Sequence, residues 1–91
     1  MMKRFHVIFK GDVQGVGFRY TVSELARKYD LTGSVENLSD GTVEVYFQGD
    51  EEAVKAAIAD ATDPLRYIYV TDTVIREEEV NYYEHFFTTR Y

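Results

Sequence analysis

The chain contains no cysteine and only one proline among its 91 residues, and it has no long apolar run. The absence of cysteine excludes a disulfide scaffold, a thiolate metal site and a cysteine nucleophile, and it fits a reducing compartment. No stretch reaches membrane-spanning length, and the N-terminal MMKRFHVIFKG is too short and too mixed for a signal peptide. We therefore expect a cytoplasmic protein without a membrane partner.

Positive charge is scarce, since ten Lys and Arg residues face sixteen Asp and Glu residues and give a formal net charge of -6. Proteins that bind DNA or RNA draw most of their affinity from Lys and Arg, so this charge disfavours a nucleic-acid partner. A small anionic ligand remains compatible with it, because a local site can override the overall field. Neither His6 nor His85 belongs to a set with metal-ligand spacing, and we expect structural histidines, no metal and no cofactor.

Hydrophobic periodicity divides the chain into alternating strands and helices. Alternating apolar residues predict strands at residues 4–10, around Val35 and Asn37, at 43–48 and in RYIYVTDTVI (66–75), while HFFTTRY (85–91) can add a short last strand. Helical spacing predicts one helix over residues 19–29 and a second that begins at Asp50, as a capping residue, and ends at the Asp63-Pro64 break. The sequence SDG at 39–41 predicts a hairpin turn.

The order β-α-β-β-α-β predicts an α+β, ferredoxin-like two-layer sandwich with a possible short extra C-terminal strand. We expect a single domain over residues 1–91, with a mostly antiparallel sheet and two helices on one face. Right-handed crossovers make the first and second strands parallel, with the third strand between them. The loop after the first strand and Asn37 near the end of the second should therefore lie at the same end of the sheet.

RNA-recognition domains share this order of elements, and the many tyrosines of the chain, including Tyr46 and Tyr67, could stack on bases. Those domains carry an aromatic and basic segment on their third strand. The corresponding strand here reads TVEVYFQG, with Glu44 and no Lys or Arg. The RNA-binding interpretation is therefore disfavoured. The acidic run REEE at 76–79 is expected to be a solvated, protective edge.

The most informative stretch is GDVQGVGFRY, Gly11 to Tyr20, which holds three of the six glycines. It lies between a predicted strand and a helix N-terminus, where free N–H groups and the helix dipole favour an anion. Gly15 and Gly17 would let the loop amides turn inward as a nest, and Arg19 would add a planar cation that matches phosphate oxygens. A plain tight turn with an exposed arginine is the alternative.

Two kinds of residue would support this loop. Gly11 is expected to let the strand turn, and the apolar side chains are expected to anchor the loop to the core; these are Val13, Val16 and Phe18.

Asn37 shares a strand face with Val35, and a buried amide must be hydrogen-bonded. It can bond to the backbone of the hairpin, or it can hold a water beside the anion site through its donor and its acceptor.

The stretch GDVQGVGFR resembles the acylphosphatase signature G-x-V-Q-G-V-x-[FYM]-R at every fixed position. The stretch GSVENLSDGTVEVYFQG resembles the second signature of that family, and the matching positions are Gly33, Val35, Asn37, Gly41, Val43 and Gly49. Ser34 stands where an aromatic residue is usual, and Glu36 where a basic or neutral residue is usual. The ending FFTTRY is similar to the closing strand of the family, so the resemblance covers nearly the whole chain.

The resemblance implies a metal-independent hydrolase that converts a carboxyl–phosphate mixed anhydride into a carboxylate and inorganic phosphate. Arg19 and Asn37 would be the catalytic residues, with Asn37 orienting the attacking water. The phosphoryl group would lie on Arg19 and on the loop amides of Gly15, Val16, Gly17 and Phe18. The loop would be supported by Gly11, Val13 and Gln14. The expected partner is a small acyl phosphate, with phosphate or sulfate as occupants of the site.

The short chain with both signatures is expected to be a free-standing, monomeric enzyme and not part of a hydrogenase-maturation protein with a similar domain. Ser34 and Glu36 keep an alternative open, which is a weakly catalytic phosphate- or carboxylate-binding regulatory module of the same fold. Glu36 adds negative charge near a site for a dianion, although alternation points it to the face opposite Asn37. The loss of an aromatic side chain at position 34 would loosen the packing or remove part of a substrate wall.

Overall fold

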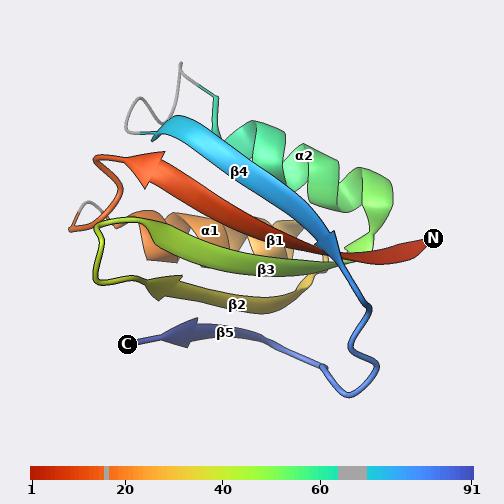
Figure 1. The fold of residues 1–91 in the computed structure, drawn as a ribbon. Coiled ribbons are helices and arrows are strands. Elements are labelled where there is room, and N and C mark those ends of the chain that lie inside the picture. Colours follow the sequence, from red (N-terminus) through yellow and green to blue (C-terminus); the bar gives the residue numbers. More distant parts are fainter. Residues whose placement is uncertain (16, 64–69) are drawn as a thin grey trace.

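In a computed structural model the chain forms a five-stranded sheet with both helices on one face (Figure 1). The structure describes residues 1–15, 17–63 and 70–91. The strands are β1 (Met2–Gly11), β2 (Thr32–Asn37), β3 (Val43–Asp50), β4 (Val70–Glu78) and β5 (Phe87–Arg90). The helices are α1 (Phe18–Lys28), between β1 and β2, and α2 (Glu51–Ala61), which follows β3.

The strands lie in the order β4-β1-β3-β2-β5. β1 is antiparallel to β3 and β4, β2 is antiparallel to β3, and β5 runs parallel to β2 at the far edge. β1 and β2 are therefore parallel with β3 between them, as the handedness of the crossovers predicts. The ferredoxin-like α+β expectation is confirmed, and the short C-terminal strand is present as β5.

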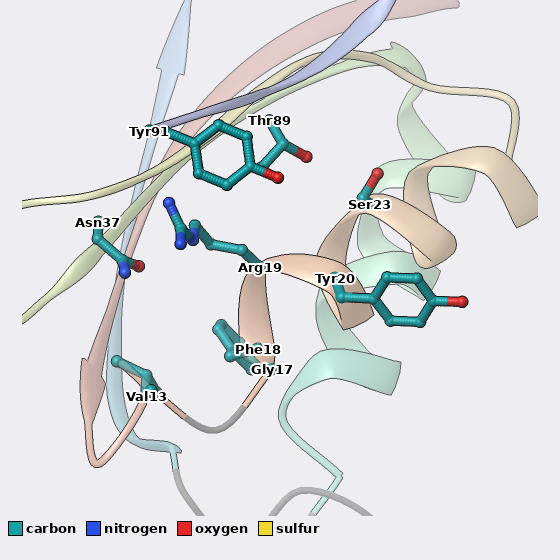
Figure 2. A pocket seen from close by; sticks show the side chains of 10 residues that line it. Val13, Gly17, Phe18, Arg19, Tyr20, Ser23, Asn37, Thr89 and Tyr91 are labelled. Carbon is teal, nitrogen blue, oxygen red and sulfur yellow. The ribbon is translucent and has the colours of Figure 1, made fainter.

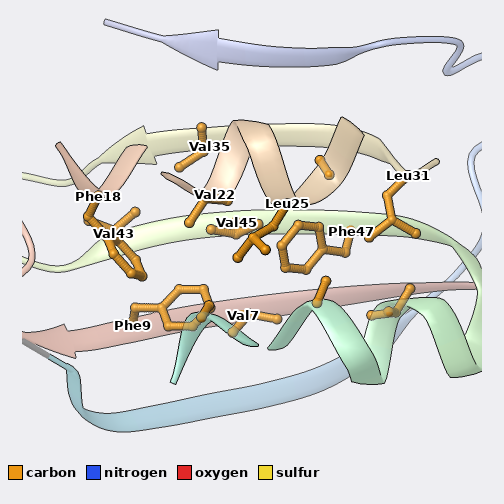
Figure 3. Packing of buried hydrophobic residues seen from close by; sticks show 14 of the residues in the cluster. Val7, Phe9, Phe18, Val22, Leu25, Leu31, Val35, Val43, Val45 and Phe47 are labelled. Carbon is orange, nitrogen blue, oxygen red and sulfur yellow. The ribbon is translucent and has the colours of Figure 1, made fainter. Parts of the chain in front are cut away.

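The core lies between the sheet and the helices (Figure 3). Alternate residues of the strands point into it, because side chains of a strand alternate between the two faces of the sheet. The helices contribute residues at helical spacing. The buried apolar residues are Val7, Phe9, Val13, Phe18, Val22, Leu25, Ala26, Leu31, Val35, Val43, Val45, Phe47, Val54, Ala57 and Ala61.

The strand residues that alternate with the buried ones lie on the open face of the sheet, and many of them are polar. His6 lies on this face, where its Nε2 atom is 2.8 Å from Glu44 Oε2 and its ring packs beside Tyr46. The structural interpretation of His6 is therefore confirmed. No helix in the described ranges is long and apolar enough to cross a membrane.

Several predicted boundaries shift in the structure. β1 is longer than residues 4–10, and α1 begins and ends one residue before 19–29. β4 extends past residue 75 because its pairing with β1 continues to the partners Arg4 and Glu78. Most of the acidic run 76–79 thus lies on an edge strand, as expected. Residues 66–69 of the predicted fourth strand, and Pro64, lie outside the described residues.

The capping prediction for Asp50 is wrong in one respect. Asp50 is the N-cap residue of α2, but its side chain makes no capping hydrogen bond. The register of β1 and β3 places Met2 opposite Asp50, which brings the chain terminus to this carboxylate. The Met1 ammonium is 3.1 Å from Asp50 Oδ1. The Asp50 side chain therefore forms this ion pair and not a capping hydrogen bond.

Candidate functional site

The loop after β1, the last residue of β2 and the end of β5 meet at one end of the sheet. Parallel β1, β2 and β5 all finish on this side, so their C-terminal residues converge there. They enclose a cavity of about 240 Å³ (Figure 2), lined by Val13, Gly15, Gly17, Phe18, Arg19, Tyr20, Ser23, Asn37, Thr89 and Tyr91. The neighbourhood of Arg19 and Asn37 that the topology predicts is thus present in the structure.

The backbone of the loop has the conformation that its glycines permit. Gly15 and Gly17 both have φ of 78°, in the left-handed region that side chains disfavour. Gly17 is the N-cap residue of α1 and offers no side-chain cap, and no acidic residue stands in the first turn. Among the described residues no side chain caps the first-turn N–H groups of α1, so these groups can bind an anion. Val16 lies outside the described residues.

The loop is anchored on two sides. Val13 and Phe18 are buried in the core, as predicted, and the Phe18 ring meets Phe9 edge-on at a centroid distance of 5.1 Å. On the other side, Gln14 Nε2 donates hydrogen bonds to the carbonyl oxygens of Leu38 at 2.7 Å and Thr42 at 2.9 Å. One amide group thus ties the loop to the β2–β3 hairpin, which follows Asn37 directly.

Gly11 ends β1 with φ of 126°, where the pairing of β1 with β4 shifts register. This conformation matches the expected role of Gly11 in turning the strand into the loop.

Arg19 extends from the first turn of α1 into the cavity, with its guanidinium between Asn37 and Tyr91 in Figure 2. Its Nη1 atom donates a hydrogen bond to the carbonyl oxygen of Arg90 at 2.9 Å. Its Cζ atom lies 4.7 Å from the centroid of the Tyr91 ring, within the range of a cation–π contact. The end of the chain thus holds the cation of the site in place.

Asn37 lines the cavity and carries an unsatisfied acceptor. Its Oδ1 atom is buried and has no hydrogen-bond partner in the described part of the chain. The hairpin is closed without it, because Leu38 N–H donates to Thr42 and Gly41 N–H donates to Leu38. The expectation that Asn37 oxygen bonds the hairpin backbone is therefore not met, and a buried acceptor of this kind calls for a water or ligand donor.

Glu36 points away from this cavity. Its register partners are Glu44 on β3 and Arg90 on β5, which belong to the open face of the sheet. Ser34 shares that face opposite Tyr46 and is largely buried, and it does not line the cavity. The idea that position 34 forms part of a substrate wall is therefore wrong, because strand alternation directs its side chain to the opposite face.

Five residues that line or support the cavity were not predicted as site residues from the sequence. They are Tyr20, Ser23, Thr89, Arg90 and Tyr91. The ending FFTTRY could have pointed to the last three, since a closing strand parallel to β2 must finish beside Asn37. Ser23 lies one helical turn after Arg19, so helical spacing alone places it on the same face.

The cavity has the chemistry of an anion site. It combines the Arg19 guanidinium, the open N-terminus of α1 and the amide of Asn37. Within residues 1–15, 17–63 and 70–91, no group of three His, Asp or Glu side chains is arranged to hold a metal ion. The arrangement suits a small tetrahedral anion, and the polar side chain beside it can bind a water molecule.

A family model described as acylphosphatase matches residues 5–89. An acylphosphatase from Clostridium acetobutylicum is 39% identical over 77 residues, which are 85% of each chain. An acylphosphatase from Geobacillus thermodenitrificans is 61% identical over 54 residues, and this match spans 59% of our chain and only 57% of that protein. The crystal structure of acylphosphatase from Bacillus subtilis superposes with a TM-score of 0.87 at 35% identity, over the whole of both chains.

Proposed function

Because the chain belongs to the acylphosphatase family, we propose that it is a hydrolase of acyl phosphates, with a reaction centre formed by Arg19, Asn37 and the loop between β1 and α1. In this reaction RCO–O–PO₃²⁻ and water give RCOO⁻ and H₂PO₄⁻. The bond between water oxygen and phosphorus forms, and the bond from phosphorus to the acyl oxygen breaks. The carboxylate leaves with the electron pair, and both water hydrogens end on the phosphate.

Arg19 and the loop amides would hold the phosphoryl group. The amides are those of Gly15, Val16, Gly17 and Phe18. Two observations support this assignment, namely the left-handed glycines that open the loop and the absence of a capping side chain at the α1 N-terminus. Negative charge spreads over the phosphoryl oxygens in the transition state, so fixed donors and a guanidinium stabilise it without reorganisation. The same donors would accept inorganic phosphate or sulfate.

Asn37 would orient the attacking water. The observation that carries this step is its buried Oδ1 atom, which lacks a partner in the described ranges, on a residue that lines the same cavity as Arg19. That oxygen can accept a hydrogen bond from the water while the water oxygen faces phosphorus. Holding the water in this way converts an encounter in solution into an oriented attack, which lowers the entropic part of the barrier.

The proposed reaction needs neither a general acid nor a metal. A carboxylate is a weakly basic leaving group, so it departs without being protonated. Positioning and fixed positive charge can then supply most of the catalysis. This chemistry fits a site whose charged side chain is an arginine. We also propose that the protein acts as a monomer, since no step of this mechanism calls for a residue of a second copy.

The decisive experiment measures hydrolysis of benzoyl phosphate by the wild-type protein and by the Arg19→Ala variant, with and without EDTA. We expect turnover that EDTA does not change, that inorganic phosphate inhibits competitively, and that Arg19→Ala abolishes together with phosphate binding. Phosphate binding by the wild-type protein without turnover above the Arg19→Ala background would instead favour the regulatory binding module. Loss of activity in EDTA would contradict the metal-independent mechanism.

A further inference from the structure

The sheet has an open edge at β4. The strand order places β4 outermost, on the side of α2 (Figure 1), and of the described residues only those of β1 pair with it. The strand runs for nine residues from Val70 to Glu78. The backbone groups on its outer side can therefore form a ladder with another extended segment, which is one way in which proteins bind peptides.

An apolar groove adjoins this edge. It has a volume of about 320 Å³, lies between α2 and β4, and is lined by Phe5, Val54, Lys55, Ile58, Ala59 and Ile75. Ile75 is 49% exposed, although isoleucine is usually buried. The groove thus offers a space that one apolar side chain of an added strand could fill, and the burial of apolar surface would stabilise the complex.

Ile75 and Glu77 lie on the same face of β4, the face that carries the helices. The register pairs Ile75 with Val7, a core residue. It pairs Glu77 with Phe5, which packs against the core. Because directly opposed residues share a face of the sheet, a strand added to β4 would place one residue at Ile75 and another at Glu77, two positions apart on its own face.

The C-terminal end of this edge is acidic. Glu77 shares a cation with Glu51, since Lys3 Nζ lies 3.6 Å from Glu77 Oε1 and 3.5 Å from Glu51 Oε1. Within the described ranges Glu78 and Glu79 have no ion-pair partner, and both line a cavity of about 550 Å³ together with Glu77. A second copy would bring the same carboxylates and a net charge of -6, so the edge disfavours self-pairing and favours a basic strand.

We propose that the edge of β4 is a docking surface for a basic, extended segment of another protein. The segment would add to β4 as an antiparallel strand, because antiparallel ladders are slightly more stable per residue. Its apolar residue would fill the groove beside Ile75, and a lysine or arginine two positions away would pair with Glu77. The inference goes beyond the proposed function and does not depend on it, since none of the residues Val70–Glu78 lines the anion cavity.

The test measures binding of the fluorescein-labelled peptide KKTIVTK by fluorescence anisotropy. In antiparallel register its central isoleucine meets Ile75, and its lysines meet Asp72, Glu77 and Glu78. We expect binding that weakens as the salt concentration rises, and that is weaker about threefold to tenfold in Ile75→Thr and about twofold to fivefold in Glu77→Gln. Glu52→Gln is the matched control and should bind like the wild type, because the Glu52 side chain is 82% exposed on α2 and lines neither space.

Two further peptides separate the charge from the groove. The peptide EETIVTE reverses the charge, and KKTSVTK replaces the isoleucine that would fill the groove. Both should bind at least about threefold more weakly than KKTIVTK. Equal binding of all three peptides, or equal affinity of the wild type and both β4 variants, would overturn the docking surface. Dimerisation of the protein alone that Ile75→Thr abolishes would assign the edge to a second copy and overturn it as well.

Turnover provides an independent reading of the same variants. Ile75→Thr and Glu77→Gln should hydrolyse benzoyl phosphate like the wild type, because both side chains are about half exposed and lie outside the anion cavity. Absence of turnover in all three proteins would contradict the proposed hydrolase and leave the peptide measurements to decide the docking surface. Turnover without specific binding of KKTIVTK would overturn the docking surface and leave the hydrolase intact.

Discussion

Arg19 and Arg90 are 71 residues apart in sequence, yet Arg19 Nη1 donates a 2.9 Å hydrogen bond to the carbonyl oxygen of Arg90. The Tyr91 ring lies against the same guanidinium. A long arginine side chain loses considerable rotamer freedom when it is fixed. The end of the chain contributes part of this ordering before any ligand arrives. The proposed phosphate site is therefore preorganised by β5 and the residue after it, which lie outside both stretches that resemble the acylphosphatase signatures.

Removing the Tyr91 ring should therefore weaken phosphate binding without unfolding the protein. An exposed cation–π contact contributes about 0.5–1 kcal/mol, so we expect Tyr91→Ala to raise the inhibition constant of phosphate about twofold to fivefold. Tyr91→Phe keeps the ring and should behave like the wild type. Tyr82→Ala, at another exposed tyrosine, controls for general surface effects. Equal inhibition constants for Tyr91→Ala and the wild type would contradict a role for the ring in holding Arg19.

Substitution of Asn37 should separate turnover from binding. In the proposed mechanism Asn37 contacts the water and not the phosphoryl group, so Asn37→Ala should lower kcat roughly a hundredfold while phosphate inhibition stays nearly constant. Asn37→Asp keeps an oxygen acceptor but adds a negative charge beside an anion, so it should weaken phosphate binding as well. Steady-state kinetics with phosphate as inhibitor distinguish the two variants. A parallel loss of kcat and phosphate binding in Asn37→Ala would place Asn37 on the phosphate instead.

The hydrogen bonds of the Gln14 amide should stabilise the fold and also order the loop between β1 and α1. Gln14→Leu keeps an apolar body but removes the donor that serves the carbonyl oxygens of Leu38 and Thr42. Both carbonyl oxygens keep a backbone donor, because Gly41 N–H donates to Leu38 and Leu38 N–H donates to Thr42. The variant therefore loses two hydrogen bonds that contribute about 0.5–1.5 kcal/mol each, and we expect a loss of about 1–3 kcal/mol in the free energy of unfolding, measured with urea.

The Gln14→Glu variant adds a control for shape. A carboxylate cannot donate to the two carbonyl oxygens, so Gln14→Glu should be destabilised at least as much as Gln14→Leu above the pKa of the new side chain. Both variants should also bind phosphate more weakly, because the loop is no longer tied to the hairpin. Wild-type stability in both variants would show that these hydrogen bonds contribute nothing measurable.

Much of this arrangement could be predicted from the sequence, because it depends on local periodicity and on chain handedness. Alternation in β1 and β3 and the helical spacing of α1 are local properties, and the right-handed crossover then places Asn37 near the loop. The ion pair of Met1 with Asp50 could not be predicted, since it depends on which residues of β1 and β3 face each other. The support of Arg19 by Arg90 depends likewise on which edge β5 joins.

Asp40, in the hairpin next to the site, should make a pH-dependent contribution to the free energy of unfolding. Its carboxylate accepts hydrogen bonds from Thr42 Oγ1 and Thr42 N–H, and these bonds hold the pKa of Asp40 below its usual value of 3.8. A carboxyl group with a lowered folded-state pKa stabilises the fold above its unfolded pKa, and this contribution is lost as the pH falls through the folded value.

Asp40→Asn should therefore flatten the acid side of the stability profile. We expect the difference in unfolding free energy between wild type and variant to be constant near neutral pH and to shrink below about pH 4. Urea unfolding at a series of pH values measures this difference. A difference that persists unchanged at pH 2 would mean that hydrogen bonding to the ionised carboxylate is not its source.

Gly33 should tolerate substitution poorly. It has φ of 135°, and a Cβ atom there would lie 1.7 Å from the carbonyl oxygen of Tyr46 on the neighbouring strand. Its N–H also donates to the carbonyl oxygen of Phe86, which leads into β5. Gly33→Ala must therefore strain the backbone and separate β2 from β3, and we expect a loss of about 3 kcal/mol or more.

Gly41→Ala is the matched control for this substitution. Gly41 also has a positive φ, of 92°, but a Cβ atom there would meet no atom within 4 Å. Its cost should be limited to backbone strain, of the order of 1–2 kcal/mol, so urea unfolding of the two variants separates strain from steric overlap. If Gly33→Ala proved no less stable than Gly41→Ala, the close approach of β2 to β3 at this position would not be a constraint on the fold. If it proved much less stable, the displacement of β2 should also weaken phosphate binding, because the same strand ends at Asn37 and the neighbouring β5 ends at Arg90.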